Sequence, residues 1–345
     1  MYKRAYGIIE TLAPLHVGAT AGEESGNLNL IFRDQFTQTG IIPGSSIRGR
    51  FRSEMRSLRQ AHLEKALTEK KVEVPNSSLR EIVEVLADGK EKKTPWLNWL
   101  EKKAQEAKIA TPRNIDESFW YGTSADSELS DSTTEAVIKF EYASIVWLPV
   151  FCPGQPVVWV SSPKLLKRYQ RVAGHSIPSI KNLTSSEIDN LKYTGSSTTS
   201  KLKLLTVGEK QKLFFNFGLL ELEKTQDLTA WFPSGEELPA VVVADDEIGM
   251  IHDMALYRQS RVRLKDDEKL VKDGGFFNTE ALPEGTIMVF PIAIRETDSE
   301  WKPFDNNDQS GELYLGGLES IGFGNCQITL KNLHADKTTQ SEVAA

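Results

Sequence analysis

The sequence predicts an α+β fold in which hairpins and helices are interspersed, rather than a doubly wound parallel sheet. Apolar segments of alternating pattern, bounded by Gly and Pro, predict strands, and the amphipathic segments between them predict helices. The chain has 345 residues, of which 39% are hydrophobic and 26% are charged. This composition is typical of a globular protein with a buried core, and no repeat of fixed period is present.

The N-terminal part of the chain predicts two strands, a loop and a long amphipathic helix. Residues 4–17 are rich in aromatic and β-branched residues and predict a strand, whereas the small and polar residues 18–29 predict a loop. Residues 30–34 predict a short strand, and a helix is expected after it, with Ser45 or Ser46 as N-cap. The helix has an apolar face with Ile47, Phe51, Met55 and Leu58, and a basic face with Arg48, Arg52, Arg56 and Arg59.

Residues 60–118 predict a mostly helical segment. Three stretches have helical periodicity, "LEKALTEKK", "SLREIVEVLADGK" and "PWLNWLEKKAQEAK", and Pro and Gly residues separate them. The second stretch is expected to end at Gly89, because glycine readily adopts the left-handed conformation that follows a helix.

The C-terminal part predicts further strands, two hairpins and a basic helix. Two strands around a Pro-Gly turn are expected over 136–160, and a basic helix is expected to start at Pro163, with Ser161 or Ser162 as its cap. Residues 176–232 are mixed and predict loops and strands. The remaining expected elements are a strand leading into a helix over 239–256, a hairpin over 258–277 with Asp-Asp-Glu at its tip, a strand over 285–296, and a glycine-punctuated loop followed by a strand over 313–330.

Cysteine content and hydropathy predict a cytoplasmic protein in a reducing compartment. The two cysteines, Cys152 and Cys326, are far apart in sequence, so they predict neither a disulfide framework nor a four-cysteine zinc site. The N-terminus lacks the long apolar region of a secretory signal, and no charge-free stretch reaches transmembrane length. We therefore expect no membrane partner.

The charge pattern is informative although the net charge is −7. An acidic protein is at first sight a poor candidate for binding nucleic acid. The basic residues are concentrated in three regions, however, namely 48–59, 164–171 and 258–272. Because phosphate contacts are local, such regions can bind nucleic acid on a protein that is acidic overall.

Four segments in order, "PLHVG", "IIPGSSIRGRFR", "PVVWVSSPKLLKRY" and "LGGLESIGFGNCQI", resemble the landmarks of the RAMP superfamily. Within it, the chain resembles the repeated backbone subunit (Cmr or Csm type) of type III CRISPR effector complexes, most closely the Cmr type. Two further stretches, "RVRLKDDEKLVKDGGFF" and "LPEGTIMVFPI", resemble that subunit's hairpin and the following strand.

The resemblance implies a ferredoxin-like (RRM-like) core with a thumb β-hairpin. This RAMP domain would be discontinuous, over 1–59 and 119–335, with 60–118 as a helical insertion and 336–345 as a disordered tail. The implied partners are CRISPR RNA, target RNA and other type III effector subunits stacked head-to-tail. The implied role is antiviral defence within a ribonucleoprotein complex.

The resemblance also implies which residues bind RNA. Arginine forks suit phosphate, the first turn of a helix offers N–H donors, and a glycine loop lets an RNA backbone approach closely. Each feature also has an ordinary structural explanation, as a capped surface helix, a glycine turn, a solvated hairpin or a structural histidine. The implied RNA-binding residues are His16, Gly18, Arg33, Ser45, Ser46, Arg48, Arg52, Arg261, Arg263, Gly316, Gly317, Ser320, Gly322 and Gly324.

The aspartate used for cleavage by members of this family is missing here. It typically lies five residues before an Arg-acid pair, which in this chain is Arg33-Asp34, and the matching position is Leu28. An alkyl group cannot take a proton from a 2′-hydroxyl or hold a divalent cation. The remaining carboxylate candidates for catalysis are Glu23, Glu24 and Asp34. No metal site or structural cofactor is expected, and Mg²⁺ or Mn²⁺ would be needed only for target cleavage.

Three hypotheses follow from the sequence. The first is a CRISPR RNA-binding backbone subunit that grips guide phosphates and shapes the guide–target duplex without its own slicing aspartate. The second is a metal-dependent endoribonuclease subunit that cuts target RNA. The third is an unrelated α+β enzyme whose glycine loop binds a nucleotide, but a strand rather than a helix is expected after that loop, which argues against it.

Overall fold

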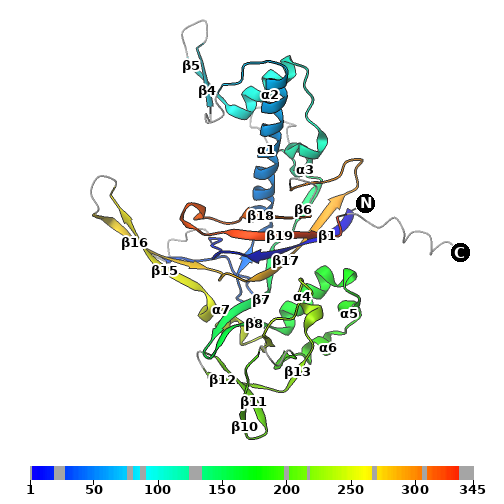
Figure 1. The fold of residues 1–345 in the computed structure, drawn as a ribbon, viewed down its shortest axis with the longest axis vertical. Helices are drawn as coiled ribbons and strands as arrows, with labels where there is room; N and C mark the ends of the chain where they lie inside the picture. The colour runs from blue at the N-terminus through cyan, green and yellow to red at the C-terminus, as the bar shows by residue number, and fades with distance from the viewer. Residues whose placement is uncertain are drawn as a thin grey trace, which may run out of the picture. The chain divides into compact units, whose positions relative to one another are not determined.

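In the computed structural model, the chain forms two compact units; Figure 1 shows the fold of the whole chain. The smaller unit comprises Met1–Tyr2, Arg48–Lys139 and Ile294–Asp308, and the larger unit comprises Lys3–Ile47, Phe140–Ala293 and Gln309–Ala345. Helices and strands occur throughout, so the predicted α+β class is confirmed. The structure describes residues 2–18, 28–75, 81–85, 91–123, 134–197, 202–215, 218–265, 270–304 and 309–333.

A large mixed sheet organises the larger unit. Its strands follow the order β13-β9-β14-β8-β7-β17-β1-β19-β18, and β3 also pairs with β7. The pairs β13–β9 and β14–β8 are parallel, whereas β7–β8, β1–β19 and β18–β19 are antiparallel. The strands are β1 (Tyr2–Thr11), β3 (Ile41–Ile42), β7 (Ala143–Cys152), β8 (Gln155–Ser161), β9 (Thr194–Ser196), β13 (Lys224–Gln226), β14 (Ala240–Val242), β17 (Ile287–Arg295), β18 (Ser310–Tyr314) and β19 (Asn325–Lys331).

Three helices cover part of this sheet and form a hydrophobic core cluster with it. The apolar sides of α4 (Pro163–Ala173), α5 (Pro178–Lys181) and α6 (Ser185–Asp189) pack in one cluster with buried side chains of β1, β7 and β14. Strand β7 is apolar on both faces, as expected for a strand in the middle of a sheet. At the centre of the cluster, the Trp147 and Phe232 rings stack with their centroids 4.5 Å apart.

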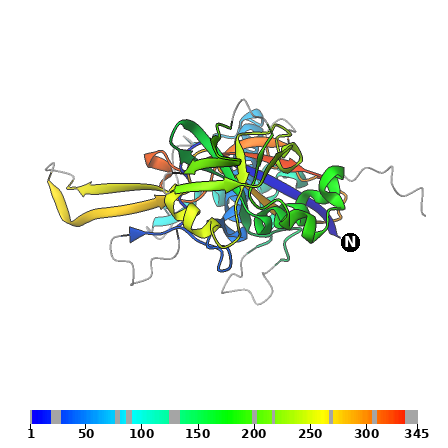
Figure 2. The same cartoon turned by 90° about the horizontal axis from the view of Figure 1, so that it is seen from below.

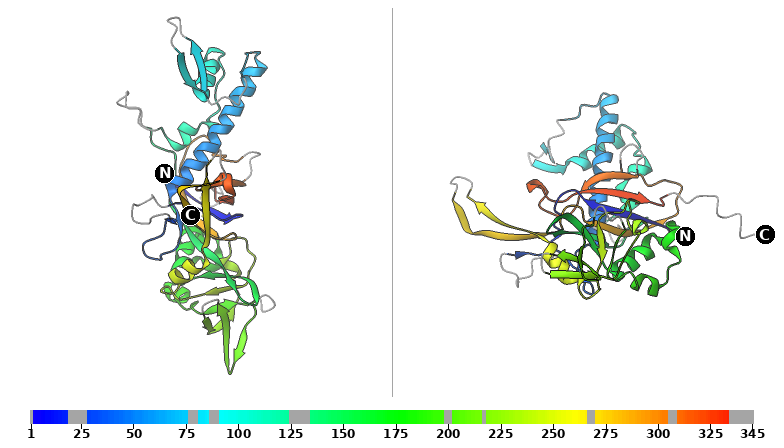
Figure 3. Two further views of the ribbon diagram at one scale, coloured as in Figure 1. Left: turned by 90° about the vertical axis from the view of Figure 1, so that its left-hand side faces the viewer. Right: turned by 60° about the horizontal axis from the view of Figure 1, so that its bottom comes forward.

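The predicted hairpin near residue 260 is confirmed. Strands β15 (Tyr257–Leu264) and β16 (Val271–Ala281) pair antiparallel, and β2 (Leu28–Asn29) pairs with β16 in parallel. Figures 2 and 3 show the hairpin projecting away from the large sheet. Its predicted Asp-Asp-Glu tip lies outside the described residues. The other elements of this unit are α7 (Ile248–Ala255), a sheet of β10 (Leu205–Val207), β11 (Lys210–Phe215) and β12 (Gly218–Leu222), and the short turns η2 (Gly174–Ser176), η3 (Thr229–Trp231) and η5 (Glu319–Ile321).

The smaller unit is built on most of the long helix α1 (Gly44–Glu69). Leu63 and Leu67 of α1 form a separate core with Trp96, Trp99 and further residues of α2, and the two indole rings are stacked. The other elements are α2 (Trp96–Glu106), η1 (Arg113–Ile115), α3 (Glu117–Tyr121) and the hairpin of β4 (Glu81–Val85) and β5 (Glu91–Pro95), while β6 (Ile138–Phe140) continues into the larger unit.

One helix prediction in this unit is wrong. The stretch "SLREIVEVLADGK" has helical spacing, but the structure forms strand β4 there, paired antiparallel with β5. Ile82, Val83 and Val85 are β-branched, so they lose side-chain freedom in a helix and favour a strand once a partner is available. The expected C-cap Gly89 lies outside the described residues.

A fully buried histidine joins α7 to the segment before β3. His252 Nε2 accepts a hydrogen bond from the Gly40 backbone N–H at 2.9 Å, so its proton lies on Nδ1. Burial, and secondarily the positive charge of Arg33, lower the pKa of His252 to about 4, although Asp253 acts in the opposite direction. The histidine is therefore neutral in the folded protein at neutral pH.

We expect this histidine to make the fold less stable in mild acid. An unfolded histidine binds its proton near pH 6.5, whereas His252 binds it only near pH 4 in the folded state. Between these values the unfolded state holds more protons, so stability rises with pH. From pH 7 to pH 5 the loss attributable to His252 is about 2 kcal/mol. Urea unfolding of the wild type and of His252→Gln at both pH values measures it, and an equal loss in both proteins would contradict the prediction.

Both cysteines are buried and reduced. Burial raises the pKa of the Cys152 thiol and of the Cys326 thiol to about 12. In the part of the chain that the structure describes, no helix is both long enough and apolar enough to cross a membrane.

Candidate nucleic-acid interface

The glycine loop between β18 and β19 is fastened to the segment that follows β1. The Gly317 N–H donates to the His16 carbonyl oxygen and the Gly324 N–H donates to the Pro14 carbonyl oxygen, each at 2.9 Å. A Cβ at Gly316 would overlap that same His16 oxygen, and a Cβ at Gly324 would overlap the Leu315 oxygen. Glycine is therefore required at both positions by the close approach of two backbones.

The other side of this loop is open to solvent. Gly316, Ser320 and Gly322 are exposed, and nothing lies within 4 Å of the position of a Cβ at Gly317 or Gly322. The backbone is left-handed at Gly316, at Gly322 and also at Leu318, where φ is 66°. The loop thus presents backbone rather than side chains over much of its outer surface.

His16 and Gly18 lie beside this loop. His16 is buried, and its Nδ1 lies 2.6 Å from the Glu280 carbonyl oxygen on β16. A Cβ at Gly18 would stand 3.0 Å from His16 Nε2, so the small residue leaves room for that edge of the ring. The histidine therefore connects the segment after β1 to the base of the β15–β16 hairpin. This contact is the one expected of a structural histidine.

A buried carboxylate next to His16 binds two arginines. Glu280 is 2% exposed; its Oε2 accepts from Arg33 Nη2 at 3.0 Å, and its Oε1 accepts from Arg258 Nη2 at 3.0 Å and Nε at 3.2 Å. Arg33 also pairs with Asp253 on α7. The structure therefore places Arg33, a predicted RNA contact, in an ion-pair network that fixes the base of the hairpin.

Arg261 continues this neighbourhood along β15. Its guanidinium lies over the buried Phe323 ring of the glycine loop at 4.9 Å, and its Nη2 donates to Gln259 at 2.7 Å. Arg263 follows on the same strand, but its side chain lies outside the described residues. Contacts thus run from the glycine loop through His16 and Glu280 to Arg33, and Phe323 of the same loop contacts Arg261 directly.

The predicted helix cap differs from the observed one. Helix α1 begins at Gly44, so Ser45 and Ser46 lie inside its first turn, and the Ser46 N–H donates to the Pro43 carbonyl oxygen at 2.9 Å. Residue 44 has no room for a side chain, because a Cβ there would overlap the Phe140 carbonyl oxygen. The side chain of Ser45 is exposed.

Much of the arginine stripe on α1 has structural partners in the smaller unit. Arg48 donates from Nε to the Tyr121 carbonyl oxygen at 3.1 Å, and Arg59 pairs with the buried Glu117 at 3.0 Å. Arg56 also lies 3.6 Å from Glu117. These contacts hold α3 against α1, which is the ordinary explanation of a basic helix face.

Arg52 is the exception in this stripe. In the described part of the chain Arg52 makes no hydrogen bond or ion pair, and its Nε, like that of Arg59, is buried without a partner. Burial, together with the charges of Arg56 and Arg48, lowers the pKa of Arg52, although Glu117 partly offsets this. An anion at Arg52 would relieve the repulsion between these arginines, so Arg52 is the stripe residue best suited to a phosphate.

The carboxylate candidates for catalysis do not form a metal site in the described residues. Asp34 Oδ1 accepts from the Phe36 N–H at 3.0 Å, the Thr37 N–H at 2.8 Å and the Thr37 hydroxyl at 2.9 Å. Partial burial acts to raise its pKa, but these hydrogen bonds prevail and lower it. Asp34 therefore shapes a turn through backbone N–H groups and has no hydrogen bond to Arg33. Glu23 and Glu24 lie outside the described residues, within which no group of three potential ligands is present.

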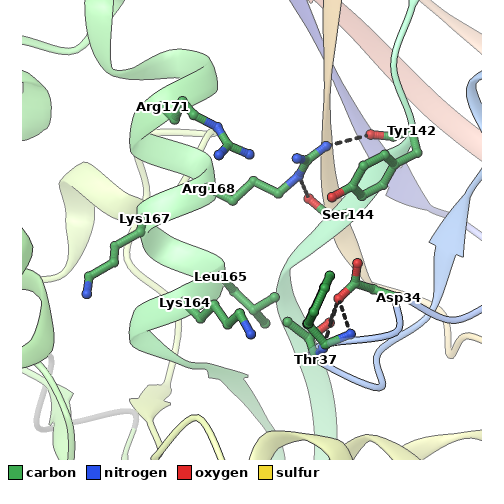
Figure 4. Close-up of a pocket in the computed structure, with 10 residues that line it drawn as sticks. Asp34, Thr37, Tyr142, Ser144, Lys164, Leu165, Lys167, Arg168 and Arg171 are labelled. Carbon is green, nitrogen blue, oxygen red and sulfur yellow. Dashed lines mark hydrogen bonds between the residues drawn. The ribbon is translucent and has the colours of Figure 1, made fainter.

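A second basic site lies on α4 and was not among the predicted site residues. Figure 4 shows Arg168 reaching from α4 to Tyr142 and Ser144, opposite the turn that Asp34 shapes. The concentration of basic residues over 164–171 was the available signal. The aromatic residues that complete the site come from distant segments, so sequence spacing could not reveal them.

Comparison with known proteins identifies the family. The RAMP superfamily profile matches residues 8–327. Solved structures with similar folds include Type III-B Cmr-beta in the apo state, with 19% identity, coverage of 96% of this chain and 98% of that chain, and a TM-score of 0.55. Type III-B Cmr-beta bound to cognate target RNA is similar as well, with 18% identity, coverage of 95% of this chain and 97% of that chain, and a TM-score of 0.54. Oligomeric Cmr4 from Pyrococcus furiosus is also similar, with 16% identity, coverage of 96% of this chain and 99% of that chain, and a TM-score of 0.51. No curated protein matches the chain. The profile spans most of the sequence and agrees with the family that the sequence motifs resemble. The chain therefore belongs to the RAMP superfamily.

Proposed function

We propose that this chain is a CRISPR RNA-binding backbone subunit of a type III interference complex. It would grip guide RNA phosphates and shape the guide–target duplex while other effector subunits stack on it head-to-tail. Membership of the RAMP superfamily supports this proposal, as does the fold shared with Cmr-beta and Cmr4. Among those structures, one Cmr-beta complex is bound to cognate target RNA and one Cmr4 is oligomeric.

The observation that carries the proposal is the convergence of four separate segments. The glycine loop, the segment of His16 and Gly18, the Arg33 strand and the base of the hairpin at Arg261 are joined by direct contacts. The resemblance implies that residues of all four bind RNA. The buried side chains of these segments stabilise the fold. The exposed backbone of the glycine loop and the exposed surface of the hairpin would contact the RNA.

The finer architecture belongs to the same proposal. The large sheet with α4 on it would include the ferredoxin-like core, and the projecting β15–β16 hairpin would be the thumb that separates nucleotides of the guide–target duplex (Figure 2). Hydrogen bonds between Arg258 on β15 and Glu280 on β16 anchor the two strands of this arm at its base.

We further propose that this subunit does not cut RNA by itself. Position 28 is a leucine, and Asp34 is engaged by three donors of its own turn. No observation favours the endoribonuclease alternative. The nucleotide-binding enzyme is disfavoured because strand β19, not a helix, follows the glycine loop.

We expect the chain, purified with the products of neighbouring genes, to carry RNA of uniform length. Arg52→Gln should weaken RNA retention and reduce the slope of log affinity against log salt by about 0.7 to 0.9, because one phosphate contact is lost. Arg50→Gln is the matched control, since Arg50 on the same helix pairs with Glu54. Salt titrations of RNA binding by the reconstituted complexes measure both slopes. Unchanged binding by Arg52→Gln would remove this residue from the interface, and a complex without RNA would refute the function.

A further inference from the structure

A pocket of about 250 Å³ lies between α4 and the turn that follows Arg33, in the larger unit (Figure 4). Four of its lining residues are cations from successive turns of α4, and one is a carboxylate, Asp34. Two aromatic residues, Phe36 and Tyr142, also line it. None of these residues is among those that the resemblance implies for guide binding. The four cations are Lys164, Lys167, Arg168 and Arg171.

One cation of the pocket is fixed in place. Arg168 Nε donates to Ser144 Oγ at 2.6 Å and its Nη2 donates to the Tyr142 carbonyl oxygen at 3.0 Å. The guanidinium carbon lies 3.8 Å from the centroid of the Tyr142 ring. These contacts form a rigid, flat and positively charged wall, which is the kind of surface on which a planar aromatic ligand stacks.

A second aromatic residue faces the solvent with a cation beside it. The Phe36 side chain is 79% exposed, which is unusual for a phenylalanine. Lys164 Nζ lies 5.4 Å from the centroid of its ring. The backbone that carries Phe36 is held by Asp34, which accepts the Phe36 N–H. The fold therefore supports an apolar ring at the pocket in a defined position without burying it.

The pocket has an excess of positive charge. Lys167 pairs with Asp189 at 2.7 Å, but in the described residues neither Lys164 nor Arg171 has a carboxylate within ion-pair distance. Burial lowers the pKa of Arg168; Tyr142 partly offsets this effect, and the charge of Arg171 lowers the pKa further. An anionic group in the pocket would offset this repulsion.

We propose that this pocket binds one nucleotide of a single-stranded RNA, with the base against Phe36 and the phosphate between Lys164 and Arg171. An exposed ring beside Lys164 and Arg171, which have no carboxylate partner among the described residues, matches the two needs of a nucleotide, a π-face and a positive charge for its phosphate. An acidic peptide would need only the cations, so the ring favours RNA. Stacking and charge read no base edge, so binding is independent of sequence.

This inference rests on the proposed function in one respect, namely that the complex holds RNA. It goes beyond that function because it assigns a separate site to a strand outside the glycine loop and hairpin. The site lies on α4, whose packing face forms the main core, so the pocket is present on the folded chain without rearrangement of the helix.

The test uses the full chain and a fluorescent oligouridylate, with fluorescence anisotropy at increasing salt. Phe36→Ala should weaken binding about tenfold, as the loss of one stacked base predicts. Lys164→Gln should lower the salt slope by about 0.7. Two matched controls should leave both values unchanged: Phe151→Ala, since Phe151 is 63% exposed elsewhere, and Lys192→Gln, since Lys192 likewise lies over an aromatic ring.

Photocrosslinking with a 4-thiouridine oligonucleotide separates this site from the guide site. The proposal expects a crosslink in a peptide that contains Phe36 or Lys164, and its loss in Phe36→Ala. The proposed function would stand and the pocket would be overturned by one combination of results. In it, Arg52→Gln weakens RNA binding, both pocket variants leave RNA binding unchanged, and no crosslink forms at the pocket. If the wild-type protein binds no RNA, both the pocket and the proposed function are overturned. Phe36-dependent binding of a polyglutamate peptide, without any effect of Phe36 on RNA, would overturn the proposal in favour of an acidic protein partner.

Discussion

Replacing Glu280 by glutamine is expected to lower the free energy of unfolding by about 3 kcal/mol. The carboxylate is almost fully buried and is shared by Arg33 and Arg258. A neutral amide would remove the charge that Glu280 shares between two guanidinium groups at the base of the hairpin. The expected loss is at the low end for a broken buried pair, because both arginines keep some access to water and Arg33 retains Asp253.

Urea unfolding followed by circular dichroism measures this loss. Glu284→Gln is the matched control, since Glu284 is exposed and lies only four residues further along the chain. We expect its effect to remain within about 0.5 kcal/mol of the wild type. If Glu280→Gln unfolds at the same urea concentration as Glu284→Gln, the network around Glu280 does not stabilise the fold.

Replacing Gly316 by alanine is expected to destabilise the fold by about 2 to 4 kcal/mol and to reduce RNA retention. The backbone at Gly316 is left-handed, with φ at 78°, and an added methyl group would overlap the His16 carbonyl oxygen. The clash is with backbone, so no side-chain rotation relieves it. The hydrogen bond from Gly317 to the same oxygen would break as the loop shifts.

The neighbouring glycine offers a close control. Gly317→Ala adds the same methyl group one residue later, where no atom lies within 4 Å of the new Cβ and φ is not positive. We expect Gly317→Ala to unfold like the wild type. Thermal unfolding of the two variants should therefore separate widely, and equal behaviour would show that the loop is not held as the structure describes it.

The elements that the sequence predicts best are those with strong local signals. The β7–β8 hairpin follows two apolar runs around Pro153 and Gly154, and α4 begins at Pro163 as the Ser-Ser-Pro signal indicates. The strand that leads into a helix over 239–256 is present as β14 and α7. Here local propensity and tertiary packing agree, so single-sequence reasoning succeeds.

The sequence was less informative where a partner decides the outcome. The stretch "EIVEV" has both helical spacing and β-branched residues, and only its pairing with β5 selects the strand. The arginines of α1 look alike in sequence, yet Arg48 and Arg59 hold α3, while Arg52 has no hydrogen-bond or ion-pair partner among the described residues. Such differences depend on residues 58 and 73 positions away, which spacing along one helix cannot show.

The candidate site shows the same division. The motifs indicated the glycine loop, His16 and the hairpin, and direct contacts join these segments in the structure. The motifs did not indicate that Glu280 binds Arg33, or that Tyr142 and Phe36 complete a basic pocket with α4. Charge and aromatic residues can be counted in a sequence, but which of them meet is decided by the sheet.

The two native thiols are well protected against chemical modification. With a pKa of about 12, each is ionised to only about one part in 10⁵ at pH 7, and both are shielded from reagents by the surrounding protein. A single cysteine introduced at the exposed Ser320 would therefore react with a maleimide dye alone, without removal of either native residue. A fluorophore at that position would test the proposal that an oligonucleotide binds at the glycine loop.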